Sequence, residues 1–161
     1  PEWATTGKPP TRERNIITSL DLDPLKQEIF NQKLVVKYNE IRDKEVRFEE
    51  FQCEDAEYIL VAYGTSARVC QKVIQLARNE GIKFGLLRPI TLFPFPTKRI
   101  NKLADKVKFM MSIEMSAGQM VEDVQLSVNG KVPVYHFGRM GGIVTLPEEV
   151  VETLKSKIKG G

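Results

Sequence analysis

Three glycines and one arginine share the stretch Gly138-Arg139-Met140-Gly141-Gly142, which is the least ordinary run of the sequence. Glycine lets a backbone come close to a ligand or a partner protein. An arginine guanidinium binds a carboxylate or phosphate through two parallel hydrogen bonds. We therefore expect Arg139, Gly141 and Gly142 to belong to a functional loop, and partner docking fits this pattern as well as ligand binding does.

A second candidate is the turn Gly64-Thr65-Ser66-Ala67-Arg68, which has the small polar residues that can cradle a phosphate at the start of a helix. It matches neither the P-loop nor the G-x-G-x-x-G pattern. The favoured alternative is an ordinary strand-to-helix turn in which Thr65 or Ser66 caps the helix. Gly64 and Thr65 stay on the candidate list for a binding or interface role.

Two charged residues directly follow apolar runs that look like buried strands, Arg88 after one run and Glu114 after another. A charged group in such a place needs a partner. A salt bridge between Arg88 and Glu114 across the sheet edge and a contact with a ligand are equal alternatives. Downstream of Glu114, Ser116 and Gln119 have the S-x-x-Q spacing of a helix capping box.

The sequence offers no catalytic residue and no metal site. Its only histidine, His136, lies in a strand pattern, and no Ser-His-Asp or Cys-His arrangement accompanies it. A structural histidine with satisfied hydrogen bonds is therefore favoured. Cys53 and Cys70 form no C-x-x-C pair, so by themselves they cannot hold zinc or an iron–sulfur cluster.

Four apolar runs, each followed by a turn that opens a helical pattern, must position these residues: residues 58–63, 83–87, 107–113 and 132–137. Alternating strands and helices predict a parallel sheet. The carboxyl ends of such strands gather at one edge, where ligand sites of open α/β sheets form. The candidate residues should therefore lie at this edge.

An amphipathic helix is predicted before the sheet. Asp23 suits its N-cap and Pro24 its first turn, and apolar residues then recur at helical spacing to about Val46. We interpret it as a linker helix that packs on a neighbour. The expected organisation is a tail from a preceding domain over residues 1–20, the linker helix over 21–50, and an α/β domain over 51–161.

Composition limits the function classes. The chain has 161 residues, 42% hydrophobic and 28% charged, which is typical of a soluble globular domain. It has no membrane-spanning stretch and no signal-peptide pattern, so we expect a cytoplasmic protein. The net charge of +3 is mild, and the lysines lack interleaved aromatic residues, which argues against nucleic-acid binding. Because it begins with Pro1, we expect it to be part of a longer protein.

Four of these motifs together resemble the C-terminal part of the α subunit of 2-oxoacid:ferredoxin oxidoreductases. They are Ala62-Tyr63-Gly64-Thr65-Ser66-Ala67-Arg68, Leu87-Arg88-Pro89-Ile90-Thr91-Leu92-Phe93-Pro94-Phe95-Pro96, Glu114-Met115-Ser116-Ala117-Gly118-Gln119-Met120 and the Gly138-Arg139-Met140-Gly141-Gly142 loop. The run Gly118-Gln119-Met120-Val121-Glu122-Asp123-Val124 is most similar to the 2-ketoisovalerate type, and the 2-oxoglutarate type stays open. The opening Glu2-Trp3-Ala4-Thr5-Thr6-Gly7 resembles the exit from the preceding domain of that subunit.

The resemblance implies a transketolase C-terminal-like fold: a three-layer sandwich whose mainly parallel five-stranded sheet has helices on both faces. The fifth strand would lie in residues 142–146. The complete family enzyme oxidatively decarboxylates a 2-oxoacid to an acyl-CoA with thiamine diphosphate, magnesium and iron–sulfur clusters. The Gly-Asp-Gly…Asn motif that holds thiamine diphosphate and a cysteine cluster motif are not in this sequence. This chain should therefore bind no cofactor and should not be catalytic alone.

The resemblance thus implies a domain that contributes to assembly of the enzyme and to the rim of its active site. Its partners would be the preceding domain of the subunit and the β and other subunits, with a homodimer as a further arrangement. The candidate binding or interface residues are Gly64, Thr65, Arg88, Glu114, Ser116, Gln119, Arg139, Gly141 and Gly142. The alternative from another class is a free-standing α/β module that binds a small ligand at the same edge.

Overall fold

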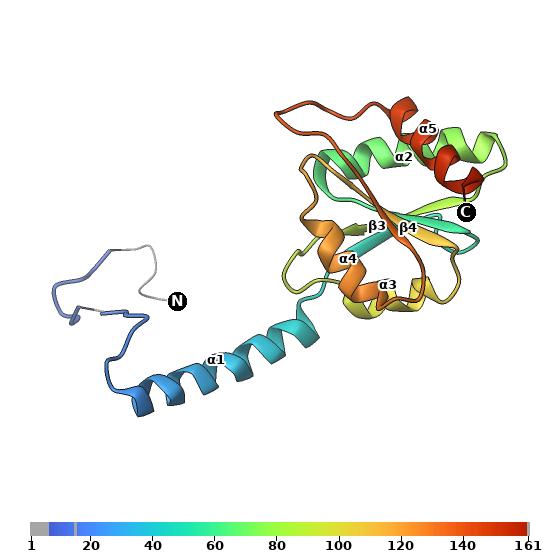
Figure 1. The fold of residues 1–161 in the computed structure, drawn as a ribbon. Helices are drawn as coiled ribbons and strands as arrows, with labels where there is room; N and C mark the ends of the chain where they lie inside the picture. The colour runs from blue at the N-terminus through green and yellow to red at the C-terminus, as the bar shows by residue number, and fades with distance from the viewer. Residues whose placement is uncertain (1–6, 15, 161) are drawn as a thin grey trace. The chain divides into compact units, whose positions relative to one another are not determined.

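The computed structural model describes residues 7–14 and 16–160, which fall into two units, Pro1–Glu40 and Ile41–Gly161. We describe each unit by itself (Figure 1). Residues 2–6 of the expected exit from a preceding domain lie outside the described residues. Within the described residues, no helix has the length and apolar character that crossing a membrane requires.

Helix α1 (Pro24–Lys44) starts where the sequence predicts. The Asp23 carboxylate accepts hydrogen bonds from the N–H groups of Leu25 at 3.0 Å and Lys26 at 3.5 Å, which confirms Asp23 as the N-cap. None of the helix's residues is buried, and its apolar side chains are open, with Ile29 54% exposed and Val36 60% exposed. Packing of this helix on a neighbour stays a prediction.

A peptide of residues 23–46 should therefore show little helicity in water by circular dichroism. Helices in proteins are stabilised mostly by packing of their apolar face, and α1 buries none of its residues. Asp23→Ala should lower the residual helicity further, because it removes the N-cap. Strong helicity of the peptide in buffer alone contradicts this prediction.

The second unit contains a five-stranded sheet in the order β1-β3-β2-β4-β5. Its strands are β1 (Phe48–Phe51), β2 (Tyr58–Val61), β3 (Phe84–Pro89), β4 (Phe109–Glu114) and β5 (Val134–Gly138). Strands β2 to β5 are parallel, and β1 pairs with β3 in the antiparallel sense. The mainly parallel five-stranded sheet predicted from the sequence is confirmed.

The position predicted for the fifth strand is wrong. Residues 142–146 form a loop that begins with Gly142 in a left-handed conformation (φ +84°), and β5 is itself an edge strand of the sheet. The fifth strand is β1, which lies at the opposite edge and starts at Phe48, before the expected domain start at residue 51. Its two central residues, Glu49 and Glu50, are exposed, so the strand has no apolar run to reveal it.

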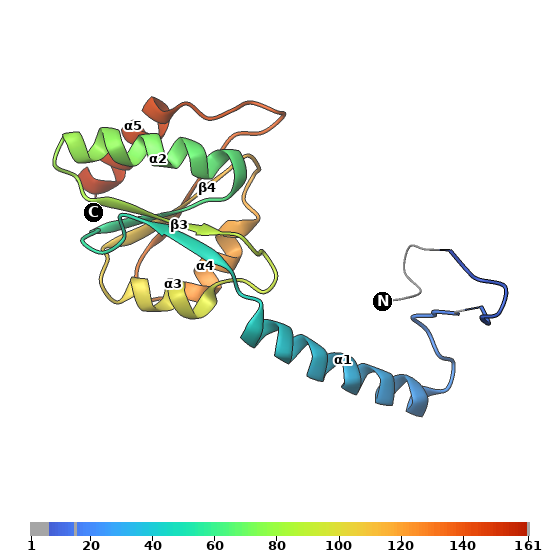
Figure 2. The ribbon, with the colours of Figure 1, turned by 180° about the vertical axis from the view of Figure 1, so that it is seen from behind.

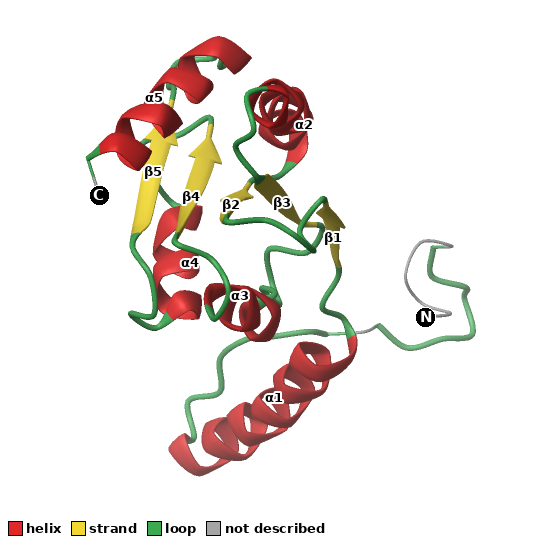
Figure 3. Ribbon diagram, turned by 90° about the vertical axis from the view of Figure 1, so that its right-hand side faces the viewer, coloured by secondary structure: helices red, strands yellow, loops and turns green. Residues whose placement is uncertain are grey.

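Helices cover both faces of the sheet. Helices α2 (Gly64–Asn79) and α5 (Pro147–Lys159) lie on one face, and α3 (Thr97–Ala104) and α4 (Met120–Val128) lie on the other (Figures 2 and 3). Neighbouring strand residues point to opposite faces. Thus Leu60 belongs to the core under α2 and α5, and Val61 to the core under α3 and α4. The domain is a three-layer sandwich.

The chain enters the sheet at the edge where the parallel strands end. Because β1 is antiparallel, Phe48 lies beside Pro89, the last residue of β3. Just before β1, the N–H of Arg47 donates to Thr91 Oγ1 at 3.0 Å, and its carbonyl accepts from the N–H of Ile90 at 2.9 Å. The segment before β1 is therefore held to the loop that follows β3.

Candidate functional site

A buried carboxylate organises the carboxyl edge of the sheet. Glu114, the last residue of β4, is only 4% exposed. Its two oxygens accept five hydrogen bonds of 2.7 to 3.0 Å, which come from the hydroxyls of Ser112 and Ser116 and from the backbone N–H groups of Gln119, Met120 and Val121. The carboxylate thus satisfies the N–H groups at the start of α4, which would otherwise lack partners.

Electrostatics favour the ionised form of Glu114. Burial opposes ionisation, but the N–H groups of Gln119 and Met120 and the serine hydroxyls outweigh it and hold the pKa of Glu114 below its usual value. The positive end of the α4 dipole favours the same form. The first turn of this helix is thereby bound to the end of β4.

This arrangement replaces two pairings expected from the sequence. The capping box of Ser116 and Gln119 is wrong: Gln119 is the N-cap but its side chain makes no capping bond, and the Ser116 hydroxyl donates to Glu114. The salt bridge between Arg88 and Glu114 is not formed, because β2 separates their strands. Arg88 instead donates to Glu49 on β1 at 2.8 Å.

His136 lies beside this carboxylate. Its Nε2 is 3.8 Å from Glu114 Oε1 and is buried without a hydrogen-bond partner, so the expected satisfied histidine is not observed. A Cβ on Gly138 would lie 2.6 Å from His136 Cε1 and would also collide with the carbonyl oxygen of Ser116. Only glycine fits there.

The loop after β5 is tied to the domain at its start. The Arg139 N–H donates to the carbonyl of Glu114 at 3.2 Å, and the Arg139 guanidinium lies 3.4 Å from the Glu149 carboxylate in the first turn of α5. Gly141 and Gly142 then have φ values of +68° and +84°, which favour glycine. The loop therefore leaves the sheet from an anchored arginine.

The turn before α2 is not capped as the sequence suggested. The helix begins at Gly64, its N-cap is Tyr63, and no side chain caps it, so neither Thr65 nor Ser66 has that role. Thr65 is exposed and Ser66 is buried. All nine candidate residues lie at or just beyond the ends of β2 to β5. Glu114 contacts Ser116 and the Gln119 N–H, whereas Arg88 and Arg139 pair with residues outside the candidate set.

Sequence reasoning missed a further feature of this edge, which we call the apolar rim. Nine large apolar side chains are exposed just beyond the ends of the four parallel strands: Tyr63, Ile90, Leu92, Phe93, Met115, Met140, Ile143, Val144 and Leu146. In the described part of the second unit, the one other exposed large apolar residue is Leu126 on α4. The sequence did contain a signal for this rim: apolar residues recur in the segments after β3 and β5, where prolines and glycines disfavour a helix or strand.

The two cysteines do not fit iron–sulfur ligation. They lie in the cores on opposite faces of the sheet. Burial and the nearby Glu50 raise the pKa of Cys53 to about 11, and burial raises the pKa of Cys70, so both thiols stay protonated whereas clusters bind thiolates. Within residues 7–14 and 16–160, no three His, Cys, Asp or Glu side chains form a metal-binding group.

Glu114→Gln should lower the free energy of unfolding at neutral pH by about 2–4 kcal/mol, because each hydrogen bond to a charged group is worth about 1.5–3 kcal/mol. The folded-state pKa is lowered, so the stabilisation is present above the pH where an unfolded glutamate titrates and is lost as the pH falls through the folded-state pKa. Urea titrations at several pH values should show the difference from wild type shrinking below about pH 4. Glu57→Gln, at a solvent-exposed pair with Lys108, is the control and should change little.

Gly138→Ala should lower the free energy of unfolding by about 1–3 kcal/mol, the range for overpacking. The added methyl collides with His136 and with the Ser116 backbone. Gly160→Ala is the matched control, since the Cβ there meets Ser156 O at 3.4 Å, an ordinary contact. Equal midpoints in urea for the two variants would refute the close approach at Gly138.

Comparison with known proteins gives consistent matches. Residues 56–150 match the family model described as pyruvate:ferredoxin oxidoreductase core domain II. The ketoisovalerate oxidoreductase subunit VorB of Methanothermobacter thermautotrophicus is 46% identical over 153 residues, which cover 95% of this chain and 43% of the relative. The 2-oxoglutarate synthase subunit KorA of Methanothermobacter marburgensis is 29% identical over 113 residues, which cover 70% of this chain and 30% of that relative. The chain spans less than half the length of these relatives.

Solved structures confirm the fold. The 2-oxoglutarate:ferredoxin oxidoreductase from Magnetococcus marinus superposes with a TM-score of 0.67 at 19% identity, over 86% of this chain and 24% of that one. A split-gene transketolase superposes with a TM-score of 0.56 at 14% identity, over 68% of this chain and 40% of that one. The resemblance inferred from the four motifs is therefore confirmed, and the chain belongs to the pyruvate:ferredoxin oxidoreductase core domain II family.

Proposed function

We propose that this chain is the C-terminal domain of the α subunit of a cytoplasmic 2-oxoacid:ferredoxin oxidoreductase of the 2-ketoisovalerate type. The observation that carries the proposal is the 46% identity to a ketoisovalerate oxidoreductase subunit over 95% of the chain. The identity to a 2-oxoglutarate synthase subunit is 29% over 70% of the chain, so the 2-oxoglutarate type is the less favoured alternative. The preceding domain and the β and other subunits are the proposed partners.

The domain's proposed role is assembly, with its edge at the rim of the active site. In the complete enzyme, thiamine diphosphate with magnesium would supply the decarboxylation chemistry, and iron–sulfur clusters the electron transfer, from outside this chain. Glu114, with Ser116 and the Gln119 N–H, fixes the edge and is a positioning residue. Interface roles are proposed for Gly64, Thr65, Arg88, Arg139, Gly141 and Gly142. Residues 1–20 and 21–47 are proposed as the tail and linker helix that join the domain to the preceding one.

The chain alone should not turn over. With 2-ketoisovalerate, coenzyme A, thiamine diphosphate, magnesium and methyl viologen, it should reduce no dye above a boiled control. The complete enzyme that contains it should reduce the dye, with a higher kcat/KM for 2-ketoisovalerate than for 2-oxoglutarate. Turnover by the chain alone, or a complete enzyme inactive with every 2-oxoacid tried, would overturn the proposal.

A further inference from the structure

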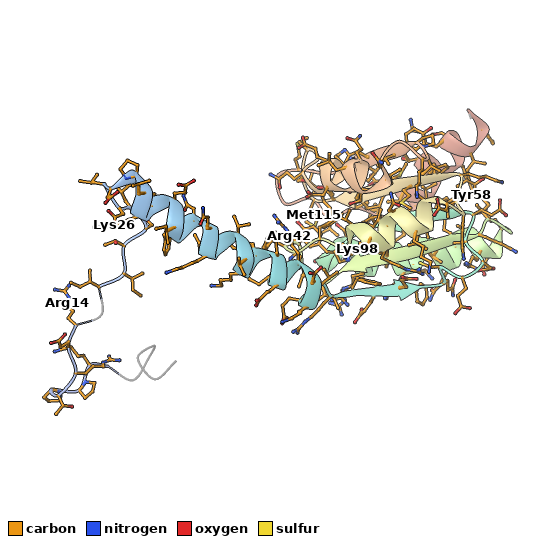
Figure 4. The ribbon with its side chains drawn as sticks, turned by 90° about the horizontal axis from the view of Figure 1, so that it is seen from below. Arg14, Lys26, Arg42, Tyr58, Lys98 and Met115 are labelled. Atoms are coloured by element: carbon orange, nitrogen blue, oxygen red, sulfur yellow. The ribbon has the colours of Figure 1, made fainter. Side chains whose placement is uncertain are left out.

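The apolar rim concentrates exposed apolar surface at one edge of the domain. On the loop after β5, Met140 is 60% exposed, Ile143 is 52% exposed and Leu146 is 58% exposed. Exposed apolar residues scattered singly need no explanation, but a set gathered in one region marks an interaction site. Figure 4 labels Met115, at the end of β4, at the opposite end of the domain from Tyr58, which starts β2.

The charged candidate residues at this edge are paired within the domain. Arg88 pairs with Glu49 at 2.8 Å and Arg139 lies 3.4 Å from Glu149. The Glu114 carboxylate is satisfied by its five donors. Beside these paired charges lie the nine exposed apolar side chains of the apolar rim, which suit the apolar surface of another folded protein segment.

The residues just before β1 indicate which protein segment would cover the apolar rim. Arg47 hydrogen-bonds to Thr91, and the Arg42 guanidinium lies over the Phe93 ring, 5.7 Å from its centre. The polypeptide therefore joins the domain at the apolar rim itself. The VorB relative is more than twice as long as the part that matches this chain, which covers 43% of it. A preceding part that is joined to the rim through residues 1–47 has a raised effective concentration there.

Strand β5 and the loop after it have unmet hydrogen-bonding capacity. In the described part of the second unit, the buried side-chain polar atoms without a partner are His136 Nε2, Arg139 Nε and Thr145 Oγ1. All three belong to residues 136–145. Buried polar atoms are nearly always paired in folded proteins. A loop that rearranges when a partner covers it would give these atoms partners.

We propose that the apolar rim is the docking face for the preceding part of the same subunit, through an apolar and largely uncharged surface of that part. This inference rests on the proposed function, because it takes the chain to be one domain of a longer subunit. It assigns the carboxyl edge of this sheet to protein docking, whereas such edges in open α/β sheets commonly bind small ligands.

Hydrogen–deuterium exchange tests the proposal by comparing the 161-residue chain with the complete subunit. In the complete subunit, the backbone amides of residues 90–95 and 139–146 should exchange at least about tenfold more slowly than in the 161-residue chain, because a packed loop opens rarely. The surface of α4 around Leu126 should be unchanged. Equal rates at the rim in the two proteins overturn the proposal.

Two matched variants sharpen the test. Ile143→Asp, made in the complete subunit, should restore fast exchange in residues 90–95, a segment that the substitution does not touch. Leu126→Asp places the same charge on the exposed apolar residue outside the rim and should restore nothing. Because Ile143 is exposed, Ile143→Asp should leave the melting temperature of the 161-residue chain nearly unchanged, which shows that the variant is folded.

Other occupants give different results. Protection that appears only when further subunits are added assigns the rim to another subunit and overturns the proposal. Self-association of the free chain in sedimentation, abolished by Ile143→Asp, assigns the rim to a second copy and also overturns it. The exchange measurement does not depend on activity. Rim protection in an enzyme that is inactive with 2-oxoacids would therefore refute the proposed function while leaving the docking face in place.

Discussion

The carboxyl edge of this domain depends on the five hydrogen bonds that the Glu114 carboxylate accepts. They join the end of β4 to the first turn of α4. Through the backbone, the Glu114 carbonyl also holds Arg139, and Glu114 pairs in register with Gly138 at the end of β5. The side chain and the backbone of this one residue therefore join two strand ends, a helix start and the loop after β5.

The same interaction decides what the edge can bind. A helix N-terminus at the end of a parallel strand commonly receives an anion from outside. At α4 the protein supplies that anion itself, so its N–H groups are already occupied. Arg88 and Arg139 are likewise paired, to Glu49 and Glu149, and the edge has many exposed apolar side chains. These features support the proposed role of the edge in protein docking.

Local signals made much of this fold predictable from sequence. Pro147 and Thr97 mark helix starts that the structure places at the same residues, and the buried apolar runs gave the four parallel strands. Strand β1 was missed because its glutamates are balanced by Arg88 and Arg99, which are 39 and 49 residues away in the sequence. Sequence order could not reveal that Glu114 would cap α4 in place of Ser116, because this contact depends on how the loop folds back.

Apolar residues of the core and of the apolar rim differ in how far their side chains are exposed. The core residues Leu60, Ile74 and Leu154 are at most 1% exposed, so the sheet and its helices bury their own apolar faces. Ile143 and Val144 are about half exposed and add little to that burial. Exposed apolar side chains favour aggregation unless a partner covers them. A core that is buried within the domain, beside an edge rich in exposed apolar side chains, therefore supports the proposal that another part of the same subunit docks at that edge.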